Sequence, residues 1–440
     1  MSSILNVDDL IDNQKLGRFN LKLLAYLFIV MLLDGYDIIA VGFAAPHLVR
    51  DWHLSPAALA PVFSASLVGI LVGSLLFGYI GDRFGRKLAL VSSCLIFGIL
   101  TVIATAATSV PELLIIRFLA GIGIGGVMPN AVALSSEYSP KRFRATMVIL
   151  MFGGNTFGAS LPGLVSILLV PRFGWQALFW VGGILPIVVA IFLMAMLPES
   201  VKFLVLSERH RARAIATLKK VLPGVHVPID AKFVMHAKTA VDRGIGQLFK
   251  GWLAWVTPLL WLTFAMNLMV FYFINSWTPT LVTQAGVDAR TAAFGLSMFQ
   301  VGGALGGVVL CRFVDRSGLK LLSALFFVCI PVVGLVGYTI GSGTFYVVGL
   351  FVVGFCVLGL QAGLNAMPGI LYPTSCRANG AGYAFGIGRI GAVVGPLVGG
   401  VLVSEHVGLH SIFLLVAIPV CVGALACFAL SQAAARGVVA

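Results

Sequence analysis

Long apolar stretches alternate with short polar breaks along the whole chain. Each stretch holds about twenty residues with few or no charges, which is the length that an α-helix needs to cross the hydrocarbon core of a bilayer. The pattern predicts six spans before a polar, basic segment and six after it. The predicted spans cover residues 23–48, 57–81, 88–108, 113–135, 145–170 and 175–197, and then 251–287, 291–311, 321–340, 345–371, 378–404 and 411–430.

These spans predict an all-α polytopic membrane protein whose twelve transmembrane helices form two six-helix pseudo-repeats. The string DRFGRK at residues 82–87 follows the second span, and a weaker copy, DRSGLK at 315–320, follows the eighth. A repeat of this kind is typical of secondary transporters. The expected divisions are a cytoplasmic N-terminal segment (1–20), a first half (21–198), a cytoplasmic basic linker (199–250), a second half (251–431) and a cytoplasmic tail (432–440).

Composition and charge agree with a membrane protein. Of the 440 residues 59% are hydrophobic and 10% charged, and the mean hydropathy of +1.04 is too apolar for a soluble chain. Of the 29 Lys and Arg residues, only Arg50, Arg172 and Arg290 fall in predicted outer loops and two fall inside spans. Positive residues stay on the cytoplasmic side, so both termini are expected there and the net charge of +13 does not indicate a nucleic-acid partner.

Several function classes find no support in the sequence. The seven cysteines are scattered through apolar runs without CxxC or Cys/His spacing, so neither a disulfide framework nor a metal site is expected. No GxxxxGK[ST] string occurs, which argues against ATP-driven transport. GxSxG and HExxH are also absent, and we expect neither an enzyme nor a cofactor.

Two acids in the first span are the strongest chemical signal. Asp34 and Asp37 lie near the middle of the bilayer, where a carboxylate is costly and by default marks an ion or proton pathway. Their i, i+3 spacing places them on one helical face, and two neighbouring carboxylates in a low dielectric disfavour double ionisation. One of them is therefore expected to carry a proton. The alternative is that both acids only pair with buried arginines.

The two arginines inside spans are the expected partners of anions. Arg117 in the fourth span lies at about the same depth as Asp37, which predicts an ion pair between them. Arg389 in the eleventh span has no acid at its depth in the second half. Its planar guanidinium is therefore predicted to bind the carboxylate of a substrate. Snorkelling to the inner surface is the alternative.

Uncharged polar and aromatic residues on neighbouring spans could complete a pocket for a hydroxylated ring. Amides and phenols donate and accept hydrogen bonds, although in membranes amides also join helices and aromatics also mark the interface. The predicted pocket residues are Tyr36, Asn267, Tyr272, Gln300, Gln361 and Asn365.

The segment after the second span resembles the signature of the major facilitator superfamily, G-x-x-x-D-R-x-G-R-[RK]. The resemblance implies a twelve-helix fold that works by alternating access, with a cytoplasmic latch between the halves. Asp82 would face basic residues or a helix N-terminus of the other half, and Gly85 would allow a tight turn. The latch residues so implied are Gly78, Asp82, Arg83, Gly85, Arg86, Asp315 and Arg316.

The string DGYD at residues 34–37 resembles the aromatic acid:H+ symporters within that superfamily. This resemblance implies a monomeric importer in a bacterial inner membrane, which takes up aromatic carboxylates such as hydroxybenzoates together with protons. Asp34, Asp37 and Arg117 would couple the protons, and Arg389 would hold the substrate carboxylate.

Other functions stay open from the sequence. Glycines from Gly382 to Gly400 fit G-x8-G-x3-G-P-x2-G-G, a pattern associated with proton-driven antiporters, but they lie in the eleventh span rather than the fifth. They serve either as a close-packing device or as a sign of export. A symporter of another small metabolite and a sensor that does not transport are further alternatives, but a sensor would have no need for costly buried charges.

Overall fold

The computed structural model describes residues 4–205, 211–221, 232–234, 245–373 and 376–437. Within this part of the chain, twelve helical segments are long and apolar enough to cross a membrane, which confirms the predicted spans. The first half contains α2 (Arg18–Asp51), α3 (Ala60–Phe84), α4 (Arg86–Ile103), α5 (Val110–Tyr138), α6 (Arg144–Leu168) and α8 (Gln176–Met196). The second half contains α11 (Leu253–Gln284), α12 (Ala289–Thr339, two spans), α13 (Gly343–Leu371), α14 (Arg377–Ser404) and α15 (Leu409–Gly437).

The repeated DRxGxK strings turn the chain at their glycines. Gly85, between α3 and α4, has φ of +107°, and Gly318, inside α12, has φ of +49°. L-residues with a side chain rarely adopt positive φ, so glycine suits both positions. The sequence predicted a loop at residues 312–320, whereas the helical backbone of α12 runs through 311–317 and changes direction only at Gly318.

The two halves repeat one packing scheme. In the first half, α2 packs on α6, α3 on α5 and α4 on α8. In the second half, α11 packs on α14, and the two spans of α12 pack on α13 and on α15. Counted within each half, the first span contacts the fifth, the second contacts the fourth and the third contacts the sixth. The structure thus shows in three dimensions the repeat that the two motifs indicate.

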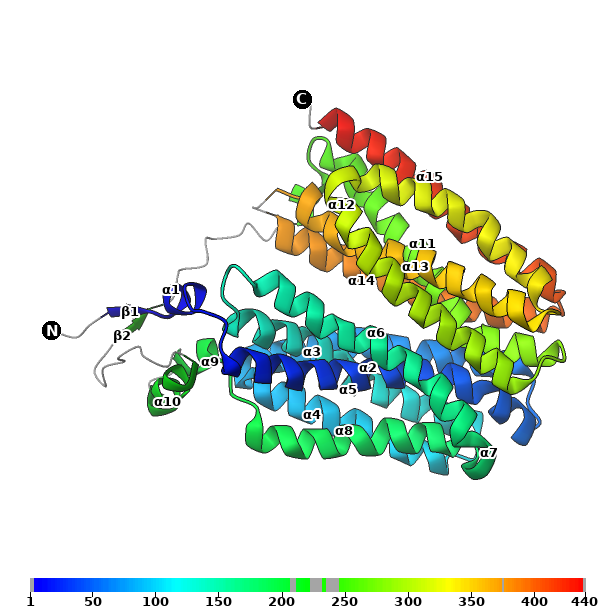
Figure 1. Cartoon of the computed structure of the whole chain (residues 1–440), viewed down its shortest axis with the longest axis horizontal. Coiled ribbons are helices and arrows are strands. Elements are labelled where there is room, and N and C mark those ends of the chain that lie inside the picture. The colour runs from blue at the N-terminus through cyan, green and yellow to red at the C-terminus, as the bar shows by residue number, and fades with distance from the viewer. Residues whose placement is uncertain (1–3, 206–210, 222–231, 235–244, 374–375, 438–440) are drawn as a thin grey trace.

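The main contacts between the halves join α2 with α11, α3 with α14 and α6 with α12, and α14 also contacts η1 (Pro56–Leu59). At some of these contacts a glycine allows the two helices to approach closely. A Cβ on Gly42 would collide with the backbone carbonyl of Asn275, and a Cβ on Gly400 would collide with the side chain of Ala60. These contacts lie toward the end of the bundle that holds η1. Toward the other end, where the chain begins and α15 ends, the halves diverge (Figure 1).

The glycine pattern of the eleventh span is a packing surface. A Cβ on Gly391 or on Gly395 would clash with the backbone carbonyl of Ala265 or Met269 on α11. The neighbouring Pro396 carbonyl accepts a hydrogen bond from the indole of Trp277, at 2.9 Å. These contacts match the close-packing interpretation of the pattern.

Short elements complete the described chain. The first half also contains η2 (Ala104–Ala106) and α7 (Val170–Phe173), and η4 (Ile245–Phe249) ends the central linker. A small group of elements lies at the end of the first half where α2 begins (Figure 1) and contains β1 (Ile4–Asn6), α1 (Val7–Asp12), α9 (Val201–Val205), α10 (Arg211–Val221) and β2 (Lys232–Val234). The strands β1 and β2 pair in parallel, so the chain start and the central linker are joined.

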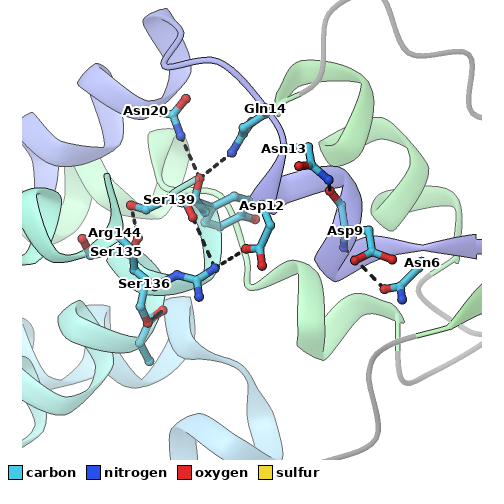
Figure 2. A network of polar contacts seen from close by, with 12 residues as sticks. Asn6, Asp9, Asp12, Asn13, Gln14, Asn20, Ser135, Ser136, Ser139 and Arg144 are labelled. Carbon is cyan, nitrogen blue, oxygen red and sulfur yellow. Dashed lines mark hydrogen bonds and ion pairs between the residues drawn. The ribbon is translucent and has the colours of Figure 1, made fainter. Parts of the chain in front are cut away.

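Polar contacts tie this group of elements to the ends of α5 and α6 (Figure 2). Gln14 and Asn20 each donate a hydrogen bond to the backbone carbonyl of Tyr138, both at 2.7 Å. Asp12 forms an ion pair with Arg144 at the start of α6. The last carbonyls of a helix have no partner within the helix, so Gln14 and Asn20 supply hydrogen bonds to the end of α5.

Candidate transport site

A buried ion pair stands at the centre of the first half. The guanidinium of Arg117 on α5 meets the carboxylate of Asp37 on α2 in a two-pronged contact, with Nη2–Oδ2 at 2.8 Å and Nη1–Oδ1 at 3.3 Å. Both side chains are fully buried, with 0% exposure. The structure therefore confirms the ion pair that was predicted from the similar depths of Asp37 and Arg117 in the membrane.

Further polar groups complete the surroundings of this pair. Thr101 on α4 donates to Asp37 Oδ1 at 2.8 Å, and Arg117 Nε donates to the hydroxyl of Ser66 on α3 at 3.2 Å. The ring of Phe179 lies 5.8 Å from the guanidinium carbon, within the range of a cation–π contact. Buried charges are tolerated only where such bonds satisfy them, so the pair is a fixed part of this half.

Asp34 has a different environment from Asp37. It is 4% exposed, and its Oδ2 accepts a hydrogen bond from the side-chain amide of Asn155 on α6, at 2.8 Å. Asp34 and Asp37 remain close enough for their charges to interact. The ion pair of Arg117 is with Asp37, whereas Asp34 forms no ion pair in the described part of the chain. One turn of α2 thus presents one carboxylate to α5 and the other to α6.

Arg389 reaches across to the other half. Its Nη1 donates to the hydroxyl of Ser74 on α3, at 2.8 Å. The sequence predicted a guanidinium without an acidic partner, and in the described part of the chain Arg389 forms no ion pair. The bond to Ser74 was not foreseen, because a comparison within one half cannot reveal a partner in the other. Binding of a substrate carboxylate by Arg389 stays a prediction.

Tyr272 on α11 borders two small cavities at the interface of the halves. The larger, about 60 Å³, is lined by Gly35, Asn155 and Gln300 among others, and the smaller, about 20 Å³, by Arg117 and Asn275 among others. Cavities of this size hold a few water molecules, whereas a ring needs on the order of 150 Å³. In this conformation each of these two cavities therefore suits water rather than an aromatic ring.

The side-chain amides of the second half form two separate hydrogen-bond networks. Gln300 on α12 donates to Asn275 Oδ1 on α11, at 2.7 Å, and both side chains are buried. Asn267 on α11 donates to Gln361 Oε1 on α13, at 2.8 Å, and Gln361 donates in turn to Asn365, at 3.0 Å. Asn365 is exposed. The network of Gln300 and Asn275 borders the interface cavities. The network that begins at Asn267 runs from the buried core of the second half to its surface.

Tyr36 does not join the predicted pocket. Its hydroxyl donates to the backbone carbonyl of Leu178 on α8, at 3.0 Å, and its ring packs beside Gly182 of the same helix. The side chain is 2% exposed and lines neither of the two interface cavities. The prediction that Tyr36 binds substrate was based on the aromatic surface it could offer beside the amides of the second half, but its side chain packs against α8 of its own half.

The latch residues of the first repeat bond within their own half. Asp82 forms an ion pair with Arg86, Arg83 donates to the hydroxyl of Tyr79 at 2.7 Å, and Arg86 donates to Asn130 at 3.3 Å. In the described part of the chain, no hydrogen bond of Asp82, Arg83 or Arg86 reaches the second half. The expected contact of Asp82 with the other half is absent in this conformation because the halves diverge at this end.

The other latch positions differ in what the structure says about them. A Cβ on Gly78 would meet nothing within 4 Å, so close packing does not demand glycine there. The side chains of Asp315 and Arg316 lie outside the described residues. Glu199, in contrast, was not predicted: its carboxylate accepts from the backbone N–H of Lys87 at 3.0 Å and thus caps the start of α4.

The sequence reasoning also missed the groups that hold the charged residues. Thr101, Ser66, Ser74 and Asn155 are uncharged, and each lies within an otherwise apolar span. Asn155 had the clearest signal, since an amide inside a span is uncommon and joins helices or lines a polar site. Small hydroxyl residues bond to their own helix so often that their positions alone carry little information.

Comparison with known proteins agrees with the geometry. A family model for the Major Facilitator Superfamily matches residues 27–389 and again residues 283–438. The chain is 37% identical to the 4-hydroxybenzoate transporter PcaK of Pseudomonas putida over 402 residues, covering 91% of this chain and 90% of that protein. It is 36% identical to a gallate transporter of Pseudomonas putida over 437 residues (98% and 96%), and 31% identical to the benzoate transport protein of Acinetobacter baylyi over 444 residues (98% and 94%).

Solved structures show the same fold at lower identity. A bacterial homologue of the human lysosomal transporter Spinster, inward-facing and occupied, matches with a TM-score of 0.70 at 18% identity, covering 95% of this chain and 98% of that chain. The xylose transporter XylE from E. coli, partially occluded and inward open, matches with a TM-score of 0.69 at 17% identity, covering 94% and 97%. The chain belongs to the Major Facilitator Superfamily and is a membrane transporter rather than an enzyme.

Proposed function

We propose that this transporter is a proton-coupled symporter that imports aromatic carboxylates, such as hydroxybenzoates, across a bacterial inner membrane. Asp34 takes up and releases the proton, while Asp37 and Arg117 form the fixed charged pair beside it. Arg389 binds the carboxylate of the substrate. The names of three relatives, which transport 4-hydroxybenzoate, gallate and benzoate, support the substrate class.

One observation carries the proposal: Arg389 of the second half crosses the interface and donates to Ser74 of the first half, while Asn155, the hydrogen-bond partner of Asp34, lines a cavity at the same interface. A substrate carboxylate that enters between the halves and binds Arg389 is repelled by an ionised Asp34. Protonation of Asp34 removes that repulsion. Binding of the proton and binding of the anion therefore favour each other, which is the requirement for symport.

Aromatic and amide side chains at the interface of the halves suit the ring of the substrate. Tyr272 lines both interface cavities, and the ring of Phe271 lies 4.9 Å from it. Aromatic faces and edges pack favourably on a planar ring. Gln300 lines one of these cavities and Asn275 the other, and both offer amide groups to a ring hydroxyl.

Transport proceeds by rocking of the halves around this site. The Lys and Arg distribution supports cytoplasmic termini, which makes the diverging end of the molecule cytoplasmic and the conformation inward-facing. The latch strings at residues 82–87 and 315–320 would then meet the opposite half when the cytoplasmic side closes. A single chain contains both halves of the site, so a monomer suffices.

Uptake by proteoliposomes tests the proposal. Purified wild type is expected to accumulate labelled 4-hydroxybenzoate, protocatechuate or benzoate only under an inward proton gradient, and Arg389→Ala is expected to abolish this. Ser160→Ala is the matched control, because Ser160 bonds only to a carbonyl of its own helix, Phe157. Extrusion under a reversed gradient without uptake would replace the proposal by proton-driven efflux. Proton-driven uptake of none of the three acids would point to a different metabolite.

A further inference from the structure

Asn155 is the one group of α6 that bonds to a carboxylate of α2. Its side-chain nitrogen lies 2.8 Å from Asp34 Oδ2. The same residue lines the cavity of about 60 Å³ at the interface of the halves, together with Tyr272 and Gln300 of the second half. Asn155 therefore stands between Asp34 and the space that the substrate approaches.

The backbones of α2 and α6 are in direct contact at this place. A Cβ on Gly35 would collide with the backbone carbonyl of Asn155, and a Cβ on Gly158 with the carbonyl of Leu32. Close contact over more than a turn fixes the backbone of Asn155 relative to α2, so its side-chain amide starts within hydrogen-bond reach of Asp34. Gly35 of the DGYD string is thus needed for the position of Asn155.

The hydrogen-bonding capacity of the amide exceeds what Asp34 uses. An asparagine side chain has two N–H donors and one carbonyl acceptor. One N–H binds Asp34, which leaves a second donor and the acceptor for the cavity or for a substrate. A protonated Asp34, in contrast, has an O–H to donate, and the amide oxygen is the acceptor within reach after a rotation of the amide.

We infer that Asn155 is a positioning residue that couples the protonation of Asp34 to occupancy of the site between the halves. This inference rests on the proposed function, since it presupposes that Asp34 carries the proton. The amide holds the ionised carboxylate in place and turns when Asp34 is protonated, which changes the hydrogen-bonding groups that the cavity presents to the substrate. The ionisable groups that interact with Asp34 are Asp37 on α2, Cys94 on α4, Tyr272 on α11 and Arg389 on α14.

The test separates proton-driven accumulation from exchange. Full-length wild type, Asn155→Ala, Asn155→Gln and Ser160→Ala are reconstituted into vesicles. Accumulation of labelled 4-hydroxybenzoate is measured under an inward proton gradient, and counterflow is measured without a gradient in vesicles preloaded with unlabelled 4-hydroxybenzoate. Counterflow needs a folded protein with a working site but no net proton movement.

Asn155→Ala is expected to reduce accumulation by about tenfold or more, which is the effect of a lost hydrogen bond to a charged group, while counterflow stays within about threefold of wild type. Asn155→Gln, which keeps the amide, is expected to recover part of the accumulation, and Ser160→Ala is expected to match wild type. Normal accumulation by Asn155→Ala would overturn the inference alone. Equal loss of accumulation and counterflow in both Asn155 variants would show a merely structural role and would also overturn it.

The failure of the proposed function has a different signature. Wild type that exchanges 4-hydroxybenzoate without accumulating it under the gradient would contradict proton coupling itself, and the inference about Asn155 would fail with it.

Discussion

The two halves share a fold but differ in chemistry. The first half contains the buried acids and the Asp37–Arg117 ion pair, whereas the membrane-spanning core of the second half contains neutral amides and Arg389. The fifth span of each half, α6 and α14, brings a polar group to the interface of the halves: Asn155 binds Asp34 and lines an interface cavity, and Arg389 binds Ser74. The comparison teaches that the two halves share equivalent helix positions but use them differently. In the proposed function, the first half binds the proton and the second half binds the carboxylate of the substrate.

The largest effect is expected from breaking the charged pair of the first half. Asp37→Ala leaves Arg117 buried without a counter-ion, which costs about 3–5 kcal/mol, so both uptake and thermal stability should be lost. Thermal unfolding in detergent, together with uptake by vesicles, measures the two effects.

A double variant sharpens this prediction. Asp37→Ala with Arg117→Ala removes both charges, so most of the lost stability is expected to return, because no unpaired charge stays buried. Uptake is not expected to return. If the single variant Asp37→Ala were as stable as wild type, the pair would not be the fixed centre of the first half.

Substitution of Arg389 in the second half is expected to weaken substrate binding without lowering the thermal stability of the protein. Arg389→Ala should weaken 4-hydroxybenzoate binding about a hundredfold, since two hydrogen bonds to a charged group are lost. Arg389→Lys keeps the charge but not the planar fork, so a loss of about tenfold is expected. Equilibrium binding to the purified protein gives both values; equal binding by all three proteins would place the carboxylate elsewhere.

A smaller effect is expected at the amides of the second half. Gln300→Leu removes a group that borders the interface cavity and leaves Asn275 without its donor. The preference for 4-hydroxybenzoate over benzoate should fall by about tenfold, which corresponds to one hydrogen bond. Competition of the two acids in counterflow measures the preference. An unchanged ratio would show that Gln300 does not contact the ring hydroxyl.

The smallest effect is expected at Tyr36. Tyr36→Phe removes only the hydrogen bond to the Leu178 carbonyl within the first half, so the KM for uptake should change less than about threefold. A KM increase of more than tenfold would instead support the prediction from sequence that Tyr36 binds substrate.

The fold was predictable because it depends on a simple physical rule. Each apolar stretch of about twenty residues must be a helix in lipid, since its backbone groups have no other partner there. The same one-dimensional reasoning, a count of residues from the membrane surface, found the Asp37–Arg117 pair. It failed at Gly318, where helical backbone continues to the glycine instead of ending in a loop.

The rest of the site depends on contacts between distant parts of the chain. Arg389 binds Ser74, which lies more than three hundred positions away, and only the packing of α14 on α3 brings the two together. Depth along the membrane does not give the direction in which a side chain points, and Tyr36 was misplaced for that reason. Asn155 was missed because its importance comes from the close contact of α2 with α6.

The most direct test of the account is a simultaneous measurement of proton and 4-hydroxybenzoate flux in vesicles that contain wild type or Asp34→Asn. The account predicts that substrate entry through wild type is accompanied by proton entry, and that Asp34→Asn exchanges substrate but moves no proton and accumulates nothing. Proton-coupled accumulation by Asp34→Asn would contradict the claim that Asp34 carries the proton.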